Sequence, residues 1–158
     1  DVEEEMKGLA AEGAALRKEL IDSIQKDTES FTAYMNALGM PKNTDEEKAA
    51  RKEAMQNGLK EAAEVPLAVA ETALKIFHVA GAVVERGNAN AVTDGLVASM
   101  MARTAVLSAL LNVKINLGSI KDEEFVARMA EKVAELEKAA MDGEKAVMEL
   151  SALTRDLV

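Results

Sequence analysis

The chain has 158 residues, enough for about one domain with a substantial core, and 49% of them are hydrophobic. Its net charge of −9 argues against a nucleic-acid partner or an anionic membrane surface. The absence of cysteine excludes disulfides and thiolate metal sites, and a single histidine cannot build a three-histidine metal site. We therefore expect a protein without a metal.

Nothing in the sequence directs the chain to a membrane or out of the cell. It shows no secretory signal and no apolar run of the roughly 20 residues that span a bilayer. The lack of cysteine is also compatible with a reducing compartment. We expect a cytoplasmic protein without a membrane partner.

Helix-forming residues fill nearly every segment, whereas aromatic residues make up only 3% of the chain and tryptophan is absent. No segment alternates apolar and polar residues as a half-buried strand does. The sequence therefore predicts an all-α fold, an antiparallel bundle of about five long helices in a single domain that covers residues 1–158.

The first two helices have clear start and stop signals. The first is predicted from about 2 to 38, because Gly39 suits a helix C-terminus and Pro41 cannot continue the hydrogen-bond ladder. The second begins after Thr44, which forms a capping-box pattern with the glutamate three residues later. We expect it to end near residue 64, because a proline two residues later disfavours helical geometry before it.

Three further helices are predicted after this break. Residues 67–86 and about 92–116 are apolar almost all round, which is typical of a central helix or an oligomer interface. A polar elbow at residues 88–94 joins them, and an amphipathic helix runs from about Asp122 to near the C-terminus. Because a small domain can enclose few helices completely, this pattern favours a dimer.

One face of the first helix carries an acid among apolar residues. At steps of three and four, this face consists of Leu20, Ile24, Asp27, Phe31, Tyr34 and Leu38. Burying an unpaired carboxylate is costly, so we expect Asp27 to be paired, kept neutral or placed at a cavity. It either hydrogen-bonds a neighbouring helix or acts as a general acid and base that partial burial holds protonated.

Four other polar side chains are candidates for contact with a ligand. Asn88 and Asp94 lie in the elbow, where helix capping is the simpler explanation and a polar pocket wall is the alternative. Asn112 and Asn116 share one face of an apolar helix. Inter-helix hydrogen bonding and ligand contact explain this second pair equally well.

Six motifs occur along nearly the whole chain: Lys26-Asp27-Thr-Glu-Ser-Phe31, Gly39-Met-Pro41-Lys-Asn-Thr44-Asp-Glu-Glu47-Lys, Val65-Pro66-Leu67, Gly87-Asn88, Thr93-Asp94 and Asn112-Val113-Lys-Ile-Asn116-Leu117. In order and spacing they resemble the cyclodeaminase family. This family is the C-terminal domain of formimidoyltransferase-cyclodeaminase and also occurs as stand-alone bacterial proteins, some described as methenyltetrahydrofolate cyclohydrolases.

The resemblance implies an all-helical fold, a homodimer and a tetrahydrofolate substrate, with no cofactor beyond that substrate. It also implies a catalytic aspartate in an Asp-x-Glu-x-Phe motif, which falls on Asp27. Family members begin with a further helix whose glycine-rich motif helps to form the folate site, and this chain has no such motif. We expect the natural protein to carry that segment upstream of Asp1; the alternative is a chain inactivated by truncation.

Three functions are consistent with these observations. The resemblance favours conversion of 5-formimidoyltetrahydrofolate to 5,10-methenyltetrahydrofolate with release of ammonia, with Asp27 as catalyst and Asn88, Asp94, Asn112 and Asn116 as substrate-binding residues. A formimidoyltransferase is then an expected partner. The second function is methenyltetrahydrofolate cyclohydrolysis at the same site, and the third is a non-enzymatic helical dimerisation module.

Overall fold

The computed structural model describes residues 1–157, and every element of that range is helical. Five α-helices and two short 3₁₀ turns follow one another as α1 (Val2–Leu38), α2 (Asp45–Leu74), α3 (Ile76–Arg86), η1 (Ala89–Ala91), α4 (Val92–Leu117), α5 (Glu123–Glu149) and η2 (Arg155–Leu157). The predicted all-α fold is confirmed.

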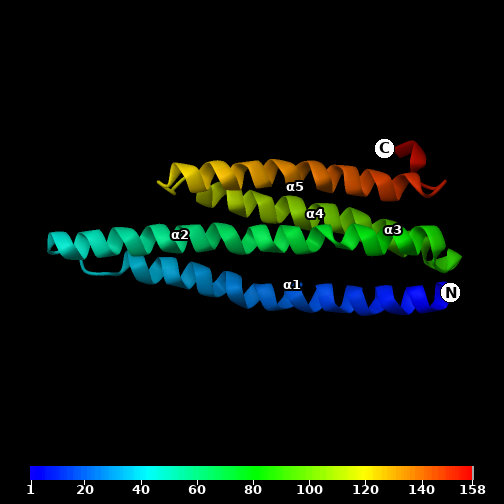
Figure 1. Cartoon of the computed structure of the whole chain (residues 1–158), viewed down its shortest axis with the longest axis horizontal. Helices are drawn as coiled ribbons and strands as arrows, with labels where there is room; N and C mark the ends of the chain where they lie inside the picture. The colour runs from blue at the N-terminus through cyan, green and yellow to red at the C-terminus, as the bar shows by residue number, and fades with distance from the viewer. Residues whose placement is uncertain (158) are drawn as a thin grey trace.

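The helices form an antiparallel bundle with α1 along one edge and α5 along the other (Figure 1). α3 continues the line of α2, and the pair packs against α1 on one side and α4 on the other. α4 also packs against α5, whereas α1 and α4 do not contact each other directly. The core lies where α2, α3, α4 and α5 meet, and its larger members are Leu59, Leu67, Phe77, Leu96, Val106, Leu110, Val113, Phe125, Met129 and Val133.

The predicted helix ends are confirmed at the connection between α1 and α2. The Thr44 side chain accepts from the Glu47 backbone N–H at 3.2 Å, and the Glu47 carboxylate accepts from the Thr44 backbone N–H at 3.3 Å. This reciprocal capping box satisfies N–H groups that have no partner within the helix. The other helix end is satisfied across the bundle, because the Arg51 guanidinium on α2 donates to the Leu38 carbonyl oxygen, the last of α1.

The prediction that the second helix ends near residue 64 is wrong, because α2 continues through Pro66 to Leu74. Proline has no backbone N–H, so it leaves the carbonyl four residues earlier, that of Ala62, without its donor. In the structure the Asn116 side-chain amide on α4 donates to this Ala62 oxygen at 2.8 Å. The neighbouring helix thus supplies the hydrogen bond that the proline removes, and α2 stays continuous.

The α1–α2 contact depends on a close approach of the two backbones. A Cβ atom built on Gly58 of α2 would lie 3.0 Å from the Tyr34 Cα atom on α1. That distance is shorter than ordinary van der Waals contact, so a larger residue at position 58 would push the helices apart. On the same pair of helices, the buried Thr72 hydroxyl donates to the Glu19 carboxylate at 2.8 Å.

The predicted packing of the Asp27 face is wrong within this single chain. Ile24 and Phe31, its neighbours on that face, are 68% and 61% exposed, and Asp27 is itself exposed. The residues that α1 buries lie on another side of the helix and include Leu9, Leu16 and Ser30. Helical spacing correctly found an apolar stripe, but its middle, from Ile24 to Phe31, faces outward, whereas Leu20, Tyr34 and Leu38 are half-buried.

Two helical segments are long and apolar enough to pass a length and composition test for a membrane span. They are Asp45–Arg86, taken as one helix, and Ala89–Leu117. The expectation that the chain has no such run is therefore wrong by this measure. Core helices of soluble proteins pass the same test, and both segments supply buried core residues such as Leu67 and Leu110.

Candidate functional site

An open pocket of about 370 Å³ lies between α1 and α4, which are separated here and share α2 as a floor. This volume is within the range typical of small-molecule sites. We call it the Asp27 pocket, and its lining is Leu20, Ser23, Ile24, Asp27 and Thr28 of α1, Pro66 and Val69 of α2, and Ala105, Ser108, Ala109 and Asn112 of α4.

Asp27 is the one ionisable residue in this lining, and its carboxylate makes no hydrogen bond or ion pair with any residue in the range 1–157. The two neighbouring hydroxyls donate back to their own helix, Ser23 to the Glu19 carbonyl at 2.9 Å and Thr28 to the Ile24 carbonyl at 3.0 Å. The carboxylate is therefore free to bind or to exchange a proton with a ligand. The predicted alternative, pairing with a neighbouring helix, is not found.

The pocket does not bury Asp27 as the sequence predicted. The residue is exposed, and its apolar neighbours on α1 line an open surface instead of a closed core. Exclusion of water from this carboxylate must therefore come from a bound substrate or from another surface placed over the pocket. Asp27 remains the predicted catalyst on the strength of its position in the pocket.

Asn112 and Asn116, predicted as one pair, are separated by the structure. Asn112 lines the Asp27 pocket, where its amide N–H donates to the Ser108 carbonyl at 3.3 Å and no donor of the described chain reaches its side-chain oxygen. The Asn116 amide is committed to the Ala62 and Asn112 carbonyl oxygens. Asn112 can thus face a ligand, whereas Asn116 holds α4 against α2, and its role in substrate binding stays a prediction.

Asn88 and Asp94 lie at the other end of the bundle. The Asn88 side chain accepts from the Asn90 backbone N–H at 2.9 Å, which is the capping role that the sequence offered as the simpler explanation. Asp94 is exposed in the first turn of α4, 18 residues before Asn112 and so about 27 Å from it along the helix axis. Within one chain the structure does not bring these two residues to the Asp27 pocket.

Sequence reasoning missed the hydroxyl groups of the pocket, namely Ser23, Thr28 and Ser108. A signal was present: Ser23 precedes Asp27 by four residues and Ser108 precedes Asn112 by four, which places each hydroxyl on the face of its polar neighbour. No group of three His, Asp or Glu side chains in the range 1–157 is arranged to hold a metal ion.

Comparison with known proteins assigns the chain to a family. The profile of the family described as Formiminotransferase-cyclodeaminase matches residues 1–135. This chain belongs to that family. The cyclodeaminase-family chain is 40% identical to a methenyltetrahydrofolate cyclohydrolase of Methylorubrum extorquens over 137 residues, which is 87% of this chain and 64% of that protein.

Two further relatives support the same assignment. Over 132 residues the chain is 36% identical to the formimidoyltransferase-cyclodeaminase of Gallus gallus, covering 84% of this chain and 24% of that protein. The crystal structure of formiminotetrahydrofolate cyclodeaminase from Thermotoga maritima superposes with a TM-score of 0.82 at 30% identity, covering 99% of this chain and 73% of that one. The chain therefore spans less than two thirds of the length of both sequence relatives.

Proposed function

We propose that this protein is an enzyme of folate one-carbon chemistry and that it converts 5-formimidoyltetrahydrofolate to 5,10-methenyltetrahydrofolate with release of ammonia. The observation that carries the proposal is the unpartnered carboxylate of Asp27 in an open pocket between α1 and α4. Membership of a family whose relatives are named for cyclodeaminase and cyclohydrolase activity supports the choice of substrate.

The reaction takes place at the formimidoyl carbon and needs one group that carries a proton from N10 to the leaving nitrogen. The folate N10 attacks the formimidoyl carbon, which becomes tetrahedral and bears three nitrogens, and N10 loses its proton. The formimidoyl group is an amidine and enters protonated, so its nitrogen is already an NH2 group in the tetrahedral intermediate. Asp27 accepts the N10 proton and delivers it to this NH2 group, which leaves as ammonia while the N5 lone pair forms the double bond of the methenyl cation. Amine leaving groups depart poorly unless protonated, so a carboxylate that shuttles the proton lowers both barriers.

The Asp27 pocket supplies groups for binding as well as for proton transfer. Asn112 offers its side-chain oxygen, and the Ser108 and Thr28 hydroxyls can accept hydrogen bonds from the N–H groups of a pterin. The floor formed by Pro66 and Val69 is apolar and suits the face of a planar ring. In this proposal no metal takes part and the folate substrate is the sole small molecule required.

Cyclohydrolysis of 5,10-methenyltetrahydrofolate to the 10-formyl compound is the second candidate. The relative that is 40% identical bears this name, which favours it specifically. Water would add to the same carbon while Asp27 accepts a proton from it. That proton would then pass to N5, which leaves the carbon as the new hydroxyl loses its own proton to become the formyl carbonyl. Both reactions share a tetrahedral centre at one carbon, so the same pocket can serve either.

A homodimer is part of the proposal, and exposed apolar side chains on the two helices that flank the pocket support it. On α1 and α4 these are Ile21, Ile24, Phe31, Met35, Val97, Met101, Leu111 and Ile115, each between 48% and 75% exposed. Exposed apolar patches of this kind mark interaction surfaces. A second copy placed here would also exclude water from Asp27, which the single chain does not do. We place the enzyme in the cytoplasm, where a formimidoyltransferase would supply its substrate.

The test is a turnover assay that offers each substrate separately. Formimidoyl- and methenyltetrahydrofolate are added to the protein, while the methenyl chromophore and free ammonia are followed. Asp27→Asn is assayed alongside Asp22→Asn, a matched control on the same helix whose side chain pairs with Lys18 outside the pocket.

Appearance of the chromophore together with ammonia, lost in Asp27→Asn and kept in Asp22→Asn, is the expected result. Loss of the chromophore faster than its spontaneous hydrolysis would assign the cyclohydrolase reaction instead. If neither substrate turns over, the enzymatic proposal fails and the non-enzymatic dimerisation module becomes the better description.

A further inference from the structure

A second open groove continues the Asp27 pocket toward the N-terminal end of α1. Its volume is about 420 Å³, and it shares Leu20 and Ile24 with the Asp27 pocket. We call it the Arg17 groove; its remaining lining is Gly13, Leu16, Arg17 and Ile21 of α1 with Ile76 and Val79 of α3. The two hollows therefore adjoin each other along α1.

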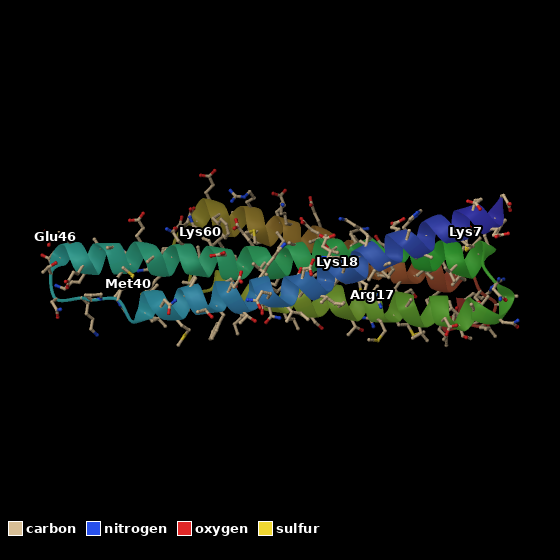
Figure 2. The ribbon with its side chains drawn as sticks, turned by 90° about the horizontal axis from the view of Figure 1, so that it is seen from below. Lys7, Arg17, Lys18, Met40, Glu46 and Lys60 are labelled. Carbon is tan, nitrogen blue, oxygen red and sulfur yellow. The ribbon has the colours of Figure 1, made fainter. Side chains whose placement is uncertain are left out.

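Arg17 is the single charged residue in this otherwise apolar lining. Its guanidinium makes no ion pair or hydrogen bond with the residues that the structure describes, whereas the nearby cation Lys18 is paired with Asp22 at 2.5 Å. Lys7, earlier on the same helix, is likewise paired with Glu3 and Glu4. Figure 2 looks onto α1 and labels Lys7, Arg17 and Lys18 along it.

An unpaired arginine can bind an anionic group of a ligand. The chain carries a net charge of −9, so a local cation favours the binding of an anionic group against the overall field of the protein. Arginine presents a planar fork of N–H donors that binds a carboxylate with two parallel hydrogen bonds. No acidic residue lines the groove to compete for that fork.

The spacing of the two charged residues suits the part of a folate that runs from the one-carbon unit to the glutamate. Arg17 and Asp27 are ten residues apart on α1, which is about 15 Å along the helix axis. In a folate, an aromatic ring and an amide separate the reacting nitrogens from the glutamate carboxylates, and the wall between Arg17 and Asp27 is apolar, formed by Leu20, Ile21 and Ile24.

We propose that the Arg17 groove binds the p-aminobenzoyl-glutamate half of the substrate, with the Arg17 guanidinium holding a glutamate carboxylate. The aromatic ring then lies against Ile76 and Val79 of α3, and the one-carbon unit reaches Asp27. Arg17 is in this role a residue that determines specificity and takes no part in the proton transfer. The assignment rests on the proposed folate activity at the adjoining pocket.

The experiment compares a substrate that has the glutamate with one that lacks it. The wild type, Arg17→Ala and Arg17→Lys are assayed with 5-formimidoyltetrahydrofolate and with 5-formimidoyltetrahydropteroate. Lys18→Ala is the matched control, because Lys18 is the adjacent cation on α1 but lies outside the groove. Binding of 5-formyltetrahydrofolate and 5-formyltetrahydropteroate is measured by calorimetry on the same four proteins.

We expect Arg17→Ala to raise the KM for the folate about tenfold to a hundredfold, with kcat unchanged, because a charge-assisted contact away from the reacting atoms is lost. The KM for the pteroate should not move, and Arg17→Lys should recover part of the affinity. Lys18→Ala should match the wild type in all four measurements.

Other outcomes separate the two proposals. An active wild type in which Arg17→Ala affects folate and pteroate equally, or neither, would overturn the role of Arg17 and leave the proposed activity standing. A wild type that turns over no substrate but binds the folate more tightly than the pteroate, through Arg17, would support the groove and refute the reaction. Absence of binding to both ligands would overturn the groove together with the proposed function.

Discussion

One face of α4 changes its contacts within a single turn: it is closed against α2 at Asn116 and open toward α1 at Asn112. On its closed side α4 contacts α2. There the Asn116 amide donates to the Ala62 carbonyl oxygen, which Pro66 leaves without a backbone donor. On its open side it faces α1 across a gap, and Asn112 lines a pocket with the unpartnered Asp27. Two asparagines four positions apart therefore differ in what their side chains can do. The Asn116 amide forms hydrogen bonds within the fold, whereas the side-chain oxygen of Asn112 is available to a ligand.

The largest expected effect lies on the open side. Asp27→Asn should lower kcat by about 10²–10⁴-fold, because the amide cannot carry the proton. Its free energy of unfolding should stay within about 0.5 kcal/mol of the wild type, since the side chain is exposed and has no partner in the described chain. Steady-state kinetics and urea unfolding of the same preparation measure both; a large loss of stability would contradict the assignment.

On the closed side the effect should fall on stability instead. Asn116→Ala should lower the free energy of unfolding by about 1–3 kcal/mol, because the Ala62 carbonyl then has no donor. The control is the double-mutant cycle with Pro66→Ala, in which residue 66 regains an N–H for that carbonyl. Urea unfolding should show a smaller cost of Asn116→Ala in this background, and an equal cost would refute the explanation of why α2 continues through its proline.

Asn112→Ala sharpens the comparison, because it is the same change one turn earlier. We expect kcat/KM to fall about twofold to tenfold, as for one lost neutral hydrogen bond to substrate. The free energy of unfolding should change by less than about 0.5 kcal/mol, because Asn112 is exposed. A loss of stability as large as that of Asn116→Ala would show that Asn112 also supports the fold, which would contradict its assignment to ligand binding.

The smallest effect concerns an ion pair away from both parts of α4, between Lys60 of α2 and Asp122 at the start of α5, with a distance of 2.7 Å. The hydrogen bond from Lys60, and then that from the Phe125 backbone N–H, lowers the pKa of the Asp122 carboxyl below its ordinary value of 3.8. The pair therefore stabilises the fold above that ordinary pKa, and this contribution is lost as the pH falls through the lowered value of the folded state.

Asp122→Asn keeps the helix cap but removes the charge, so it isolates this contribution. Its melting temperature should lie slightly below that of the wild type at pH 7, because the pair is exposed to solvent. Thermal unfolding followed from pH 7 down to about pH 2.5 should show the two proteins converging as the wild-type carboxyl becomes protonated. A gap that persists at the acid end would show that the effect is not electrostatic.

The sequence predicted those features of the fold that depend on neighbouring residues. The Gly39 and Pro41 stop and the Thr44 capping box act within one turn, so their effect could be stated without knowledge of the fold. The end predicted before Pro66 was wrong because its remedy, Asn116, lies 50 residues later on another helix. A local rule cannot include a donor that only the tertiary structure supplies.

Part of the candidate site could also be read from the sequence. Polarity on an apolar helix indicated both Asp27 and Asn112, and the structure places the two in one pocket. Periodicity alone does not distinguish a stripe that packs into the core from one that faces outward, so the burial of Asp27 was predicted wrongly. Arg17 gave no signal, because an unpaired cation can be recognised only once the ion pairs of its neighbours are known.

The bond between Asn116 and the Ala62 carbonyl also constrains how this family can change over time. Replacing Pro66 first is harmless to that carbonyl, which then gains a donor from its own helix while the amide remains. Replacing Asn116 first leaves the Ala62 carbonyl oxygen without a hydrogen-bond donor. Lineages should therefore lose the proline before the asparagine, and homologues that keep a proline at position 66 without a donor at position 116 should be rare.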